Sequence, residues 1–164
     1  MAGARASDTA SSRAVAEVEH ERVQLAFREA QQDWKNALEA HRLAPPDAGF
    51  SSRLAGLAEA ARAEARVCRD AEAAGFEWPP HRAAGSGPPY ELRPGTGRRG
   101  PDELWHAFDG AVTELNRAST GSDLLAVAVA YDDLADAAAR LAEAIEREDR
   151  ETGLLPKARV RRSA

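Results

Sequence analysis

A single heptad-like seam runs through the first quarter of the chain and ends at two adjacent prolines. Its members alternate spacings of four and three residues: Ala16, His20, Val23, Phe27, Ala30, Trp34, Ala37 and His41. This spacing places all of them on one face of a helix. Pro45 and Pro46 stop the helix, because proline lacks the backbone donor and disfavours a helical residue before it. The pattern predicts a helix over about 8–44, roughly 55 Å long at 1.5 Å per residue.

The apolar composition favours helices over sheets. Alanine supplies 37 of the 164 residues, which leaves 34 larger apolar side chains, with only eight valines and one isoleucine among them. Strands are enriched in β-branched residues, so this scarcity argues against a sandwich or an α/β sheet. Long helices that pack along narrow, alanine-rich seams fit the composition better.

A second seam predicts a helix from Ser52 to Ala74. Its members are Leu54, Leu57, Ala61, Cys68 and Ala71. Ser51 or Ser52 is expected to cap its N-terminus. Gly75 is expected to adopt the left-handed conformation after its last turn, with Phe76 packing back. The short turn over 45–50 makes the first two helices an antiparallel hairpin.

Two further helices are predicted in the second half of the chain. Pro101 suits a first helical position, and the next two residues are acidic, which complements the helix dipole. The third helix carries the stripe Leu104, Trp105, Phe108, Val112 and Leu115. Thr120 and Asp123 resemble a capping box ahead of a fourth helix over about 122–150. Its seam is Leu124, Val127, Tyr131, Leu134, Ala138, Leu141 and Ile145.

The predicted fold is therefore all-α: an antiparallel four-helix bundle, or two coiled-coil-like hairpins joined by a long connector. Residues 76–100 form that connector and contain five prolines and five glycines. The expected division is a disordered N-terminus over 1–7, a hairpin over 8–75, the connector, a second hairpin over 101–150 and a basic tail over 151–164. The connector also carries Trp78 and Tyr90, which a plain linker does not need.

Charge and cysteine content indicate the compartment. The net charge is −5, and residues 101–150 hold 12 acidic side chains against four basic ones. The one cysteine, Cys68, fits a reducing cytoplasm. The first 13 residues lack an apolar run, and the longest apolar run, Leu124–Tyr131, is too short for a bilayer. A cytoplasmic, non-membrane protein is expected, and 20 arginines against two lysines favour a GC-rich bacterial source.

Two Glu-x-x-His motifs raise the possibility of a metal-binding bundle. They are Glu17 with His20 and Glu103 with His106. At this spacing both side chains share a helix face, as in di-iron carboxylate bundles. An up-down-up-down bundle would place both motifs near one end, where Glu72 and Glu143 or Glu146 could complete the ligand set. If the connector crosses the length of the bundle instead, the motifs lie at opposite ends and form no site. No cofactor is expected.

The basic segments suggest a second alternative, a regulator that contacts nucleic acid. Arg98 and Arg99 lie in a glycine-rich stretch just before the third helix, where backbone N–H groups and a helix N-terminus favour an anion. However, Pro101 removes one donor and the acidic residues after it repel anions. The overall acidity also argues against a nucleic-acid partner.

The favoured hypothesis is a non-catalytic helical protein–protein interaction module, such as a scaffold, adaptor or regulator. No nucleophile has a base imposed beside it by the sequence, so we expect no enzyme. The first helix outruns its partner by about 14 residues, which leaves part of it for another chain. The expected partner is a second copy or a helical protein, bound through Val23, Phe27 and Trp34 of the first helix and Trp78 and Tyr90 of the connector.

Overall fold

The computed structural model describes residues 3–43, 49–76 and 99–153, with side chains described from Asp8 onward. It contains four helices: α1 (Gly3–Leu43), α2 (Phe50–Ala73), α3 (Asp102–Ala118) and α4 (Leu124–Glu151). No strand occurs in these ranges. The predicted all-α fold with four helices is confirmed. The first helix begins at Gly3, so it includes most of the segment that the sequence assigned to a disordered N-terminus.

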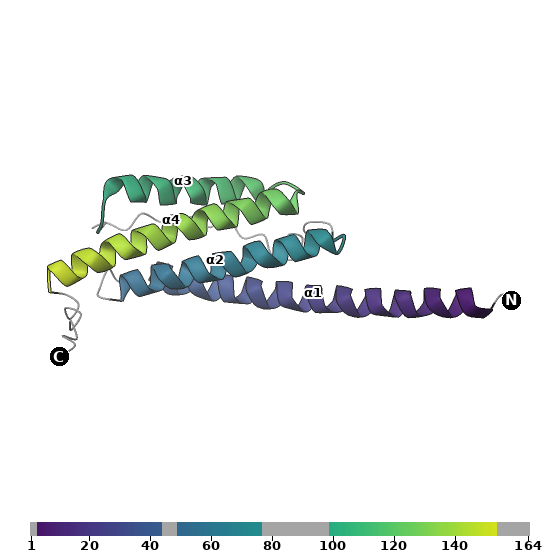
Figure 1. Ribbon diagram of the computed structural model, residues 1–164. Helices are drawn as coiled ribbons and strands as arrows, with labels where there is room; N and C mark the ends of the chain where they lie inside the picture. The colour runs from purple at the N-terminus through teal and green to yellow at the C-terminus, as the bar shows by residue number, and fades with distance from the viewer. Residues whose placement is uncertain (1–2, 44–48, 77–98, 154–164) are drawn as a thin grey trace, which may run out of the picture.

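The helices pack in the order α1, α2, α4, α3 (Figure 1). Both hairpins are antiparallel, as predicted. The pair α2 and α4 is also antiparallel, because Arg62 reaches Asp136 at 3.9 Å and Arg69, further along α2, pairs with Asp132. The start of α2 lies beside the start of α3, where the ring centroids of Phe50 and Trp105 are 6.1 Å apart. Consequently α2 and α3 run in the same direction, and α1 and α3 run in opposite directions (Figure 1).

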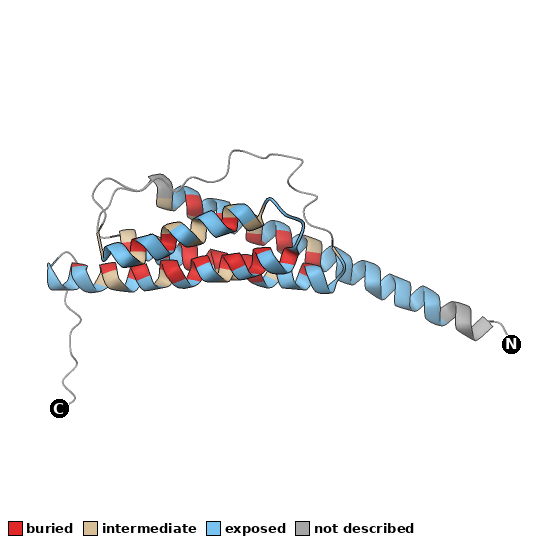
Figure 2. Cartoon of the chain, turned by 90° about the horizontal axis from the view of Figure 1, so that it is seen from above, coloured by how far each residue is buried: buried red, intermediate tan, exposed pale blue. Residues whose placement is uncertain are grey.

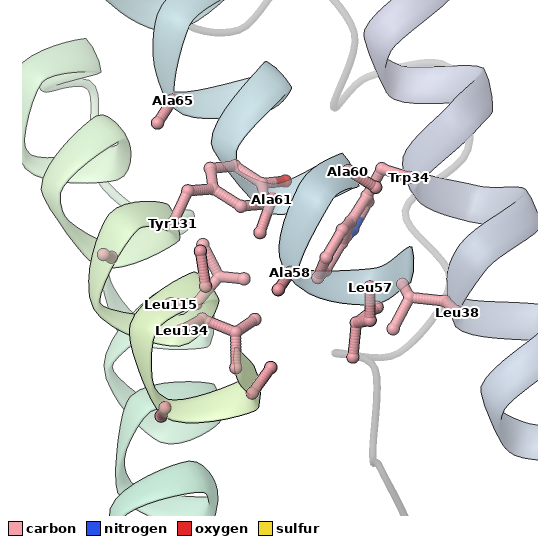
Figure 3. Close-up of a cluster of buried hydrophobic side chains, with 14 of the residues drawn as sticks. Trp34, Leu38, Leu57, Ala58, Ala60, Ala61, Ala65, Leu115, Tyr131 and Leu134 are labelled. Carbon is pink, nitrogen blue, oxygen red and sulfur yellow. The ribbon is translucent and has the colours of Figure 1, made fainter. Parts of the chain in front are cut away.

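The core follows the predicted seams. Trp34 of α1 projects between the helices toward Tyr131 of α4 (Figure 3), and the two rings meet edge to face with centroids 5.2 Å apart. Opposite them α2 presents small side chains, which let the helices approach closely: Ala58, Ala60, Ala61 and Ala65. The seam of α1 needs two corrections: Ala16 and His20 are exposed, and Leu38 is buried at 2% exposure while Ala37 is half-buried.

The helix ends combine confirmed and corrected predictions. Gly75 has φ +76°, and the N–H groups of Gly75 and Phe76 donate to the carbonyls of Glu72 and Ala71, which is the predicted left-handed C-terminal motif. Asp123, rather than Thr120, caps α4: its carboxylate accepts from the N–H groups at 125 and 126. The N-cap positions of α2 and α3 are Gly49 and Pro101, without a side-chain cap bond.

The residues that lead into α3 are fixed on the last turns of α4. The carbonyl of Arg99 accepts from the Trp105 indole N–H at 2.7 Å, and the N–H of Gly100 donates to Glu148 at 3.0 Å. Gly100 has φ +91°, and a Cβ atom there would lie 3.0 Å from a side-chain carbon of Ile145. Only glycine fits this approach without displacement. We call these contacts of Arg99 and Gly100 with Trp105, Ile145 and Glu148 the clamp. The clamp sets where α3 begins against α4.

The clamp also contains a buried ion pair, and its removal has a predictable effect. Arg99 pairs with Asp149, whose side chain is fully buried. Substitution Asp149→Asn should lower the free energy of unfolding by about 3–5 kcal/mol, because the guanidinium stays buried without its counter-ion. Urea denaturation followed by circular dichroism measures the loss. The double variant Arg99→Met with Asp149→Leu should recover most of it, and a single variant as stable as the parent would contradict the clamp.

No helix within residues 3–43, 49–76 and 99–153 combines the length and the apolar character needed to cross a bilayer.

Candidate functional site

The most distinctive feature of the molecule is the free N-terminal part of α1. This helix has 41 residues against 24 in α2. Its beginning projects well beyond the bundle (Figure 2). Every described side chain over 8–22 is exposed. The bundle ends near His20, whose ring stacks on Phe76 with centroids 3.9 Å apart. We call residues 3–19, which precede this stack, the N-terminal arm. At 1.5 Å per residue it is roughly 26 Å long.

The arm differs from the surface that the sequence proposed. Val23, Phe27 and Trp34 are 2%, 5% and 5% exposed, so they belong to the core of their own chain and are not free for a partner. The reason is that α2 covers α1 from about residue 23 onward, along the seam they share. Trp78 and Tyr90 lie outside the described residues.

The exposed apolar side chains of α1 lie on another face. Val15, Val18 and Leu25 are 69%, 67% and 58% exposed. Leu25 follows Val18 by seven positions, which is close to two helical turns, so the two side chains share one side of the helix. At 3.6 residues per turn that side lies roughly 140–180° around the helix from Val23 and Phe27. Sequence reasoning missed these residues because they lie off the longer seam.

The two Glu-x-x-His motifs do not form one site. The ring centroids of His41, near the end of α1, and Phe108, on the first half of α3, are 6.1 Å apart. Because α1 and α3 are antiparallel, the motif at Glu17 and His20 lies toward the opposite end from Glu103 and His106. A metal ion cannot span them within one chain. Among the described residues no group of three or more His, Cys, Asp or Glu side chains has a metal-binding arrangement.

The predicted anion site is also changed by the clamp. Arg99 is directed at Asp149 of its own chain and is only 17% exposed. Its charge is therefore matched internally rather than presented to an outside anion. Arg98 lies outside the described residues, as do residues 154–164 of the basic tail.

Three titratable groups in or beside the core have pKa values shifted toward the uncharged form. Burial, with a smaller contribution from nearby Glu64, raises the pKa of the Cys68 thiol to about 12. The thiol is therefore protonated at neutral pH and is a poor nucleophile. Burial, with a smaller contribution from the positive charge of Arg53, lowers the pKa of His41 to about 4. Burial likewise raises the pKa of Glu64 to about 8.

Comparison of the chain with protein-family models, curated proteins and solved structures found no match.

Proposed function

We propose that this protein is a non-catalytic helical interaction module of the bacterial cytoplasm, which binds a partner helix through the N-terminal arm. The single observation that carries the proposal is the arm itself: α1 continues past the bundle, and the side chains of residues 8–19 are all exposed, Val15 and Val18 among them. Most of the stability of a helix in a folded protein comes from tertiary packing of one of its faces, and the described side chains of the arm are all exposed. Association with another helix would supply the missing packing.

The non-catalytic character is supported by the state of the buried groups. The Cys68 thiol is buried, with its pKa raised to about 12. The His41 imidazole, with its pKa near 4, is neutral at physiological pH. Both lie against the core, which is a stabilising rather than a reactive environment. A single buried thiol also fits the reducing compartment that we propose.

The test compares two double variants of the full chain. Val15→Glu with Val18→Glu alters the arm, and Leu125→Glu with Val129→Glu alters exposed apolar residues of α4, which are 48% and 53% exposed. Both should melt within a few degrees of the parent, because surface changes have small effects. Proteins cross-linked to the parent in cells are purified, and their affinities are measured by calorimetry. We expect at least a tenfold loss for the arm variant alone.

A result in which no protein, including the chain itself, binds the parent more tightly than the arm variant would overturn the proposal. Equal losses for the two double variants would do the same, because the arm would then have no special role.

A further inference from the structure

The arm and the turns that follow it carry exposed small and apolar side chains along one face, interrupted by Glu21. We define the outer stripe as Ser11, Ala14, Val15, Val18 and Leu25. All five are exposed. Three of them are among the five large hydrophobic side chains that are exposed in the described part of the molecule. Because the stripe faces away from the seam covered by α2, a second helix can lie on it without displacing α2.

We propose that the outer stripe is the interface of an antiparallel homodimer, in which α1 of one copy packs on α1 of a second copy. This inference rests on the proposed function and names the partner of the same arm.

Charge is distributed unevenly along the first part of α1. Residues 3–14 carry Arg5 and Arg13 against one acidic group, a net +1, whereas residues 15–22 carry three glutamates against one arginine, a net −2. An antiparallel pair sets the basic segment 3–14 of each helix beside the acidic segment 15–22 of the other. Complementary charge favours this partner and this orientation over a parallel one.

The outer stripe also permits a specific antiparallel register between the two copies of α1. In this register Ala14 of one copy lies opposite Val18 of the second copy, and symmetry repeats the pair. Heptad geometry then places the two copies of Val15 beside each other at the two-fold axis. The same register sets Asp8 beside Arg22 of the second copy, and symmetry repeats this pair. Arg22 already holds Glu19 at 2.6 Å on an exposed surface, so it would bridge two carboxylates.

A parallel pair is disfavoured at one position of the stripe. Glu21 occupies a seam position there, seven residues after Ala14, so a parallel pair buries two glutamates against each other. In the antiparallel register Glu21 lies opposite Ser11 of the second copy instead. One like-charge contact remains, between the two copies of Glu17 near the axis.

Sedimentation equilibrium of the full chain at about 10–100 μM tests the dimer. We expect a dimer that Val18→Glu weakens about 100-fold, because two carboxylates enter an apolar contact. The matched control Val129→Glu, on α4, should leave the dimer unchanged. Glu17→Gln should tighten it several-fold by removing the like-charge contact. A parent that stays monomeric at 100 μM, or a dimer indifferent to Val18→Glu, would overturn the proposal.

A short bis-maleimide distinguishes the two orientations. The antiparallel register predicts efficient cross-linking of Val15→Cys and none of Leu25→Cys, whose two copies would lie far apart along the pair. A parallel pair would cross-link Leu25→Cys and refute the register. Cys68 does not interfere because its side chain is fully buried. If the parent is monomeric but another protein binds in an arm-dependent manner, the homodimer fails while the proposed function stands.

Discussion

Replacement of Glu64 by leucine is expected to raise the free energy of unfolding at pH 7 by about 2–4 kcal/mol. The Glu64 side chain is fully buried on α2, and neither carboxyl oxygen has a hydrogen-bond partner among the described residues. Burial raises its pKa from 4.5 to about 8; Asp33 of α1 adds to the increase and Lys35 opposes it. Folding at pH 7 must therefore return a proton to a carboxyl that is ionised in the unfolded chain, at about 1.4 kcal/mol per pH unit.

The sign of the pH dependence follows from the same difference. Between pH 4.5 and 8 the folded chain holds a proton on Glu64 that the unfolded chain has lost. The folded state is therefore destabilised progressively as the pH rises through this window, and the effect levels off above the folded pKa. His41, with its pKa lowered from 6.5 to about 4, acts in the opposite direction, since its effect appears as the pH falls below 6.5. The window from pH 6.5 to 8 therefore reports mainly on Glu64.

Glu64→Gln is the matched control, because it keeps the shape of the side chain and removes the titration. Relative to this variant, the parent should lose about 1–2 kcal/mol between pH 6.5 and 8. Urea denaturation at fixed protein concentration, followed by circular dichroism, provides the values. A leucine variant less stable than the parent at pH 7, or an unchanged difference between parent and glutamine variant across the window, would show that Glu64 is solvated or paired.

The sequence already contained a signal for this buried acid. The three-four spacing of α2 runs from Leu57 to Ala61 and from Cys68 to Ala71, and it passes through position 64. Charged residues are rarely buried without a partner, so a reading based on residue type omits Glu64 from the core. The spacing alone would have included it. In such a case periodicity locates the core better than polarity does.

Two other core positions differed from prediction because of helix geometry. Strict alternation of three and four assumes 3.5 residues per turn, whereas a straight α-helix has 3.6 and drifts by about 20° per heptad. An extra step of four restores the register late in a long helix. Leu38 is buried four residues after Trp34, and Asp149 is buried four residues after Ile145. The sequence reading continued the first seam to Ala37 and His41 instead of Leu38, and it ended the fourth seam at Ile145.

The path of the connector could not be predicted from the sequence. That path decides whether the two Glu-x-x-His motifs lie close enough together to form one metal site. The four helices and the two hairpins follow from periodicity and short turns, which are local. Whether 76–100 crosses the bundle depends on how the two hairpins pack on each other, and the spacing within a helix does not specify which ends of the hairpins meet. The structure places the start of α3 beside Phe50. That choice separates His20 from His106.

Truncation of Trp34 to alanine is expected to cost about 3–5 kcal/mol, the other large effect on stability. The side chain is 5% exposed and meets Tyr131 edge to face, with ring planes 87° apart. Its neighbours on α2 are mainly alanines, which are too short to fill the space that the indole leaves (Figure 3). The loss is comparable to the whole stability of many domains of this size.

Trp34→Phe keeps an aromatic ring in the same position, so it should lose much less than Trp34→Ala. Leu125→Ala, at an exposed position of α4, is the matched control and should change stability by less than about 0.5 kcal/mol. Circular dichroism during urea denaturation serves all three variants. If Trp34→Ala does not fold, the parent-to-phenylalanine difference still tests the assignment, because a solvent-facing tryptophan would tolerate both changes. A Trp34→Ala variant as stable as Leu125→Ala would mean that Trp34 does not join α1 to the core.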